Sequence, residues 1–116
     1  MLENLTPQEV QQVLHSTSRR VRILIFKRDE CPNCAFTLGQ ARRLQSSANV
    51  YTTDVDSFQD ILAAAPKIDA LRINNLLSRA AAMTTVLPLI LRIAPDGGVK
   101  MNCGAMDAAA LFTFMK

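Results

Sequence analysis

One short run of residues restricts the fold of this chain more than any other. Cys31-Pro32-Asn33-Cys34 follows an apolar, strand-like stretch at residues 21–26 after a short charged loop. Cysteines three positions apart at the start of a helix lie about one turn from each other, with roughly 5–6 Å between their Cβ atoms. Since disulfide-bonded cysteines usually have Cα atoms about 4.4–6.8 Å apart, such a pair can open and close with little backbone motion. A strand, a short loop and a Cys-x-x-Cys motif opening a helix predict a thiol–disulfide redox site.

The length and composition of the chain predict a single domain, residues 1–116, in which 49% apolar residues can form a buried core. Three cysteines are too few for a disulfide framework, and a pair plus one more is typical of a reducing compartment. The N-terminus shows no secretory signal, so we expect a cytoplasmic protein, in the host cytoplasm if the source is viral. A net charge of +3 without alternating basic and aromatic residues does not indicate nucleic-acid binding. No apolar run approaches the about 20 residues that span a membrane.

Helical and strand-like patterns alternate along the chain. The capping box at residues 6–9 predicts an N-terminal helix over 7–17. The other expected elements are a strand at 21–26, a helix at 31–45, a strand at 50–55, helices at 58–64 and 68–82, strands at 87–93 and 99–102, and a helix at 107–115. Phe36, Leu38, Ala41 and Leu44 are candidates for the buried side of the second helix.

These elements predict an α/β fold. Strands joined through helices form parallel pairs with right-handed crossovers. The Pro-Asp-Gly turn at residues 94–98 makes the last two strands antiparallel. The expected result is a four-stranded mixed sheet with helices on both faces.

Three segments together resemble the glutaredoxin family of the thioredoxin-fold superfamily, in particular its small, phage-type members. They are residues 26–34 with Cys-Pro-x-Cys, residues 86–90 around Pro88, and residues 94–97 followed by 104–107. The resemblance covers about residues 20–116 and implies a thioredoxin-like fold to which the helix at 7–17 is an addition. The chain departs from the family at Val86, where threonine is usual, and at Ala105, where a second glycine is usual.

Cys31 is the expected attacking sulfur, because unpaired N–H groups and the dipole at a helix N-terminus stabilise a thiolate. Cys34 would then resolve the mixed disulfide. Lys27 and Arg28 favour the thiolate while the two acids that follow oppose it, so we expect a Cys31 pKa below about 8.5 but well above about 3.5. The alternative of a zinc site is disfavoured because a closed site needs four ligands and only Cys103 and His15 remain. No bound metal is expected.

The resemblance implies further substrate-binding residues. Pro88 would be a cis-proline beside the cysteines, and the Leu87 backbone would pair with an incoming peptide or glutathione like an added strand. Met106 and Asp107 would hold the γ-glutamyl end of glutathione, and Arg28 its glycine carboxylate. The simpler alternatives are an ordinary strand-start proline, a helix cap at Asp107 and a surface arginine. Cys103 is either a small buried hydrophobic residue or a secondary redox site.

The resulting hypothesis is a glutaredoxin-like thiol–disulfide oxidoreductase that acts on glutathione and disulfide-containing proteins. Glutathione would be its co-substrate, with no bound cofactor. A thioredoxin reductase is an alternative electron donor. Another alternative is a binding or structural module, for example in phage assembly, that docks a protein partner through the N-terminal helix or the segment 57–83. The last is an iron–sulfur carrier that bridges two subunits through Cys31 and glutathione.

Overall fold

A computed structural model describes residues 2–56, 60–61 and 87–116. Its elements are β1 (Glu3–Asn4), α1 (Pro7–His15), β2 (Arg22–Lys27), α2 (Pro32–Ala41), the 3₁₀ helix η1 (Arg42–Leu44), β3 (Asn49–Asp54), β4 (Leu89–Ile93), β5 (Val99–Cys103) and α5 (Ala108–Met115). Asp60 and Ile61 are helical. The rest of the helices predicted at 58–64 and 68–82 lies outside the described residues, as do Val86 and nearly all of the proposed docking segment 57–83.

The described residues form one five-stranded mixed sheet in the order β1-β3-β2-β4-β5. Parallel pairing joins β1 to β3 and β3 to β2, whereas β4 and β5 are antiparallel to their neighbours. The predicted mixed sheet is confirmed, but the strand count of four was wrong. β1 is too short to show an alternating pattern in the sequence, and it is defined by contacts with β3. The Leu5 N–H donates to the Thr52 carbonyl oxygen (2.7 Å), and the Thr53 hydroxyl donates to the Leu5 carbonyl oxygen (2.9 Å).

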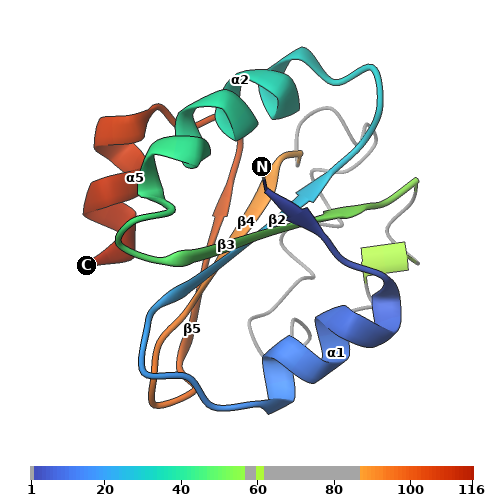
Figure 1. The fold of residues 1–116 in the computed structure, drawn as a ribbon. Coiled ribbons are helices and arrows are strands. Elements are labelled where there is room, and N and C mark those ends of the chain that lie inside the picture. Colours follow the sequence, from blue (N-terminus) through green and yellow to red (C-terminus); the bar gives the residue numbers. More distant parts are fainter. Residues whose placement is uncertain (1, 57–59, 62–86) are drawn as a thin grey trace.

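Helices cover both faces of the sheet, as predicted (Figure 1). Successive residues of a strand point to opposite faces. Leu24 and Phe26 of β2 therefore belong to a buried cluster with Val10 and Leu14 of α1. The cluster on the other face contains these residues of β2, α2, η1, β4 and α5: Ile23, Ile25, Ala41, Leu44, Ile90 and Leu111. The two clusters make β2 and β4, which are buried except at Lys27 and Arg92, the centre of the core, and α2, which carries the cysteine motif, packs against it.

α1 has the predicted start and an earlier end. The Thr6 hydroxyl accepts the Glu9 N–H (3.2 Å), and the Glu9 carboxylate accepts the Thr6 N–H (3.0 Å), which completes the capping box. The helix stops at His15 rather than at residue 17, because Ser16 adopts an extended conformation. Arg22 of β2 then makes hydrogen bonds with residues at the C-terminal end of α1. The residue Arg22 is 2% exposed. Its guanidinium donates to the carbonyl oxygens of Val13 and Ser16 and to the Ser16 hydroxyl.

One residue of the second helix was assigned to the wrong side. Phe36 is 50% exposed, whereas Thr37 is fully buried. The buried face of α2 contains Cys34, Thr37 and Ala41, which follow each other at spacings of three and four. Phe36 lies about 100° around the helix from Thr37 and therefore faces outward.

Candidate active site

Cys31 and Cys34 form a disulfide at the start of α2, with their Cα atoms 5.2 Å apart. Cys31 is the N-cap residue, and its sulfur accepts the backbone N–H of Cys34 at 3.2 Å. Pro32 occupies the first helical position, where its missing N–H leaves no donor unpaired. Cys34 is 2% exposed, whereas Cys31 is only partly buried. An incoming thiol or disulfide can therefore reach Cys31 more readily than Cys34.

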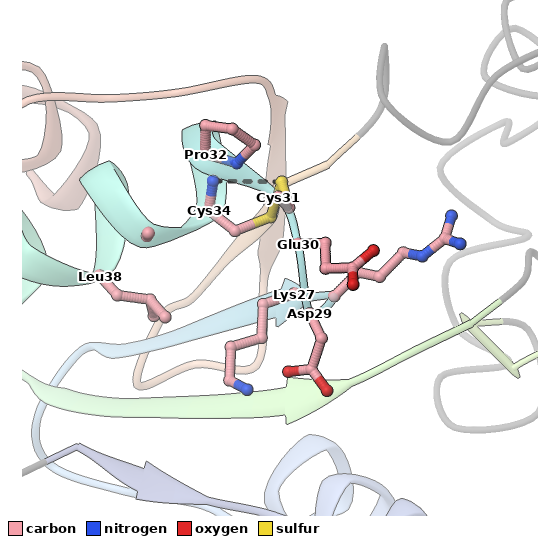
Figure 2. Close-up of a pocket in the computed structure, with 9 residues that line it drawn as sticks. Lys27, Asp29, Glu30, Cys31, Pro32, Cys34 and Leu38 are labelled. Atoms are coloured by element: carbon pink, nitrogen blue, oxygen red, sulfur yellow. Dashed lines mark hydrogen bonds between the residues drawn. A yellow bond between two sulfur atoms is a disulfide. The ribbon is translucent and has the colours of Figure 1, made fainter.

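A pocket of about 420 Å³ opens at the disulfide (Figure 2). Its lining consists of Lys27, Arg28, Asp29, Glu30, Cys31, Pro32, Cys34, Ala35 and Leu38. Lys27 ends β2, and the other charged residues come from the loop between β2 and α2, whereas the apolar ones belong to α2. A ligand in this pocket would therefore touch both sulfur-bearing residues and a set of charges.

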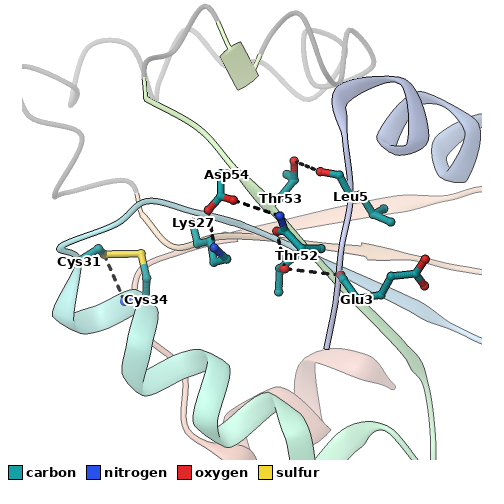
Figure 3. Close-up of polar contacts among 9 residues, drawn as sticks. Glu3, Leu5, Lys27, Cys31, Cys34, Thr52, Thr53 and Asp54 are labelled. Carbon is teal, nitrogen blue, oxygen red and sulfur yellow. Dashed lines mark hydrogen bonds and ion pairs between the residues drawn. A yellow bond between two sulfur atoms is a disulfide. The ribbon is translucent and has the colours of Figure 1, made fainter. Parts of the chain in front are cut away.

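Lys27 is held at the pocket by a polar network that the sequence did not reveal (Figure 3). Its ammonium group makes an ion pair with Asp54 at the end of β3, and the Asn4 side-chain amide donates to the same carboxylate at 3.1 Å. The Lys27 side chain is 20% exposed and that of Asp54 53%. Lys27 and Asp54 lie opposite each other in the parallel pairing of β2 with β3. β1 thereby supports a residue that lines the pocket.

Glu30, directly before Cys31, has a left-handed backbone (φ 61°). Residues other than glycine rarely adopt this conformation, because Cβ then approaches the following carbonyl oxygen. The turn allows the chain to enter α2 with Cys31 in an extended conformation (φ −111°, ψ 101°). The local backbone therefore places the first cysteine at the pocket at some conformational cost.

Pro88 is buried directly before β4 and is not among the residues that line the pocket. The Leu87–Pro88 peptide bond is cis, as the resemblance implied, and Leu87 is buried in the same cluster as Cys34. The Pro88 carbonyl oxygen accepts the N–H of Gly104 (3.0 Å), which has a left-handed φ of 99°. Cys103 is paired in register with Leu89 and packs partly buried against this cluster.

Met106 and Asp107 lie at the start of α5, and neither lines the pocket at the disulfide. The Met106 N–H donates to the hydroxyl of the buried Thr37 at 3.1 Å. Asp107 is the N-cap of α5, and its carboxylate accepts the Ala110 N–H at 2.8 Å. Gln40 of α2 accepts the Ala108 N–H at 3.0 Å. These bonds join the start of α5 to the side of α2.

The structure thus brings together part of the predicted site. Cys31, Cys34 and Arg28 surround one pocket, and Leu87 packs against the cluster that contains Cys34. Sequence analysis missed Asp54 and Thr37. The only sequence signal for Thr37 was its position three residues after Cys34, on the same face of a helix.

Within residues 2–56, 60–61 and 87–116, no group of three or more His, Cys, Asp or Glu side chains is placed to hold a metal ion. His15, the last residue of α1, is exposed. Among the helices that the structure describes, none has the length and apolar character needed to cross a membrane.

No protein-family model and no curated protein sequence matches this chain. Several solved structures, in contrast, are similar to it in fold. Chloroplastic thioredoxin z is 18% identical with a TM-score of 0.61, over 98% of this chain and 90% of that one. A thioredoxin from Aeropyrum pernix is 20% identical with a TM-score of 0.53, over 95% and 81%. StoA from Bacillus subtilis is 18% identical with a TM-score of 0.52, over 89% and 87%. At these identities the likeness establishes the fold, and it confirms the expected thioredoxin-like fold class.

Proposed function

We propose that this protein is a thiol–disulfide oxidoreductase of the glutaredoxin type, active in the cytoplasm, which reduces protein or glutathione mixed disulfides. The observation that carries the proposal is the unequal burial of two bonded sulfur atoms at a helix N-terminus. Cys31 opens on a pocket, and Cys34 is 2% exposed behind it. A redox dithiol needs this asymmetry, because one sulfur must attack the substrate and the other must react only after the mixed disulfide has formed.

The reduction of a substrate follows from this geometry. The Cys31 thiolate attacks one substrate sulfur, so that a bond to Cys31 forms, the substrate disulfide breaks, and one thiol leaves with a proton. The Cys34 thiolate then attacks the Cys31 sulfur, which releases the second substrate thiol and forms the Cys31–Cys34 disulfide. The Cys34 N–H, which donates to the Cys31 sulfur, and the other free N–H groups of the first turn of α2 stabilise the attacking thiolate.

Glutathione would return the pair to the dithiol. One glutathione thiolate attacks the Cys31 sulfur and displaces Cys34. A second attacks the glutathione sulfur of that mixed disulfide, so that glutathione disulfide leaves and Cys31 is reduced. Arg28 supports this proposal because it lines the pocket and can pair with a carboxylate. Leu87 and Pro88 would bind the backbone of the ligand. The role proposed for Met106 and Asp107 requires the Met106 N–H to exchange Thr37 for the γ-glutamyl carboxylate.

Turnover of hydroxyethyl disulfide tests the proposal. With glutathione as the reductant, we expect catalysed reduction that is proportional to the protein concentration. A parallel assay replaces glutathione and its reductase with a thioredoxin reductase and NADPH. Faster turnover with glutathione supports the glutaredoxin type. Turnover with the flavoprotein alone would overturn the glutathione dependence, and no turnover with either donor would overturn the enzymatic function.

A further inference from the structure

The charged residues that line the pocket, Lys27, Arg28, Asp29 and Glu30, form its rim, and they give the rim a net charge. Lys27 is paired with Asp54, so their opposite charges largely cancel at short range. Arg28, Asp29 and Glu30 are exposed pocket residues, and within the described part of the chain no ion pair neutralises them. One positive and two negative side chains leave a net negative charge beside the accessible sulfur.

The sign of this local charge is opposite to that of the whole chain, which is +3. A ligand in the pocket touches these lining residues, whereas the other basic residues that the structure describes do not line the pocket. The Debye length is about 8 Å at physiological ionic strength, so distant charges are screened and near ones are much less so. A small ligand in the pocket therefore meets the charges of Arg28, Asp29 and Glu30 with little screening.

Glu30 adds a second observation. Its left-handed backbone is a conformation that glycine adopts without a steric cost. The chain nevertheless has a carboxylate at this position. Figure 2 shows the side chains of Asp29 and Glu30 extending from the loop away from α2, and both residues line the pocket at the disulfide.

We propose that Asp29 and Glu30 select disulfides with positively charged groups beside their sulfur atoms, as in protein disulfides flanked by lysine or arginine. The inference rests on the proposed function and names its preferred substrate class. The chemical steps are those given above: two electrons pass from the Cys31 and Cys34 thiols to the incoming disulfide. The preference itself comes from the effect of the two carboxylates on the approach and binding of the substrate.

Three symmetrical disulfides of similar size test this preference: cystamine, with two ammonium groups; 2-hydroxyethyl disulfide, which is uncharged; and 3,3′-dithiodipropionate, with two carboxylates. The reduced protein is mixed with each disulfide at 0.15 M ionic strength, and its oxidation is followed in a single turnover. The wild type is compared with an Asp29→Asn/Glu30→Gln variant. Because this change also alters the thiolate fraction of Cys31, each rate is divided by the rate with the uncharged disulfide.

Opposite charges a few ångströms apart in water attract by an amount that corresponds to roughly threefold in a rate, so two carboxylates give roughly tenfold. We expect the relative rate with cystamine to fall roughly tenfold in the double variant, and that with dithiodipropionate to rise by a similar factor. Glu3→Gln is the matched control, since Glu3 is an exposed acid on β1 that does not line this pocket. Its relative rates should equal those of the wild type.

Unchanged relative rates in the double variant, with normal reduction of the uncharged disulfide, would overturn the charge preference and leave the proposed function intact. An equal shift in the Glu3→Gln control would also overturn it, because the effect would then come from net charge. If none of the three disulfides oxidises the reduced protein, the proposed function fails, and the preference fails with it.

Discussion

A Cys31→Ser variant is expected to lose disulfide reduction, whereas a Cys34→Ser variant should form a mixed disulfide with the substrate and stop there. Cys31 is the partly exposed N-cap of α2, and Cys34 is 2% exposed. Removing a catalytic nucleophile typically lowers turnover by at least about 10³-fold. Without Cys34, the first bond still forms at Cys31, but no internal thiolate releases the second product.

The experiment is best done in a Cys103→Ser background, so that only one cysteine remains in each variant. Mass spectrometry after incubation with hydroxyethyl disulfide then shows which sulfur forms the mixed disulfide, and its rate. Rapid adduct formation at Cys31 and slow formation at Cys34 would agree with the burial of the two residues. The reverse order would show that Cys34 is the attacking sulfur and would contradict the assignment of roles.

An Arg22→Ala variant should be the most destabilised of the polar substitutions, by about 3 kcal/mol. The buried guanidinium donates three hydrogen bonds to Val13 and Ser16 at the end of α1. A hydrogen bond from a charged donor contributes about 1.5–3 kcal/mol, and because water reaches the half-buried Val13 and the exposed Ser16, we expect about 1 kcal/mol for each bond lost. The positive charge also interacts favourably with the C-terminal end of the helix dipole. Since small domains are stable by only about 5–15 kcal/mol, this loss is large.

Urea unfolding followed by circular dichroism measures this change. Arg19→Ala serves as the control, because Arg19 is exposed and three residues earlier in the same segment, and we expect it to shift stability by at most about 0.5 kcal/mol. Arg22→Lys should recover part of the loss, since an ammonium group keeps the charge without the planar fork. An Arg22→Ala variant that unfolds at the same urea concentration as the Arg19→Ala protein would show that Arg22 does not hold α1 on the sheet.

Local signals in the sequence predicted most of the described fold. The capping box at Thr6 and Glu9 fixed the start of α1, and the turn before β5 has Gly97 at φ 91°, as a Pro-Asp-Gly sequence requires. Cys31 and Cys34 could be paired from their spacing alone. Each of these features depends on residues within a few positions of one another, so a short stretch of sequence is enough to predict it.

Features that depend on distant residues could not be predicted in this way. β1 is a strand only because β3 lies beside it, and Asp54 meets Lys27 only because β2 and β3 pair in register. The hydroxyl of the buried Thr37 has a partner because the Met106 N–H, just before α5 and far along the chain, donates to it. The apolar character of Phe36 suggested burial, but the direction in which α2 faces the sheet was decided by tertiary packing.

A redox titration of Cys31 and Cys34 against glutathione buffers tests the central claim most directly. The protein is equilibrated at a series of ratios of glutathione to glutathione disulfide, trapped with an alkylating agent, and analysed for the Cys31–Cys34 disulfide. We expect a reversible two-electron transition with a midpoint between about −200 and −270 mV, the range of glutaredoxins and thioredoxins. Cysteines that stay reduced at every ratio, or that form glutathione adducts without linking to each other, would contradict a working dithiol.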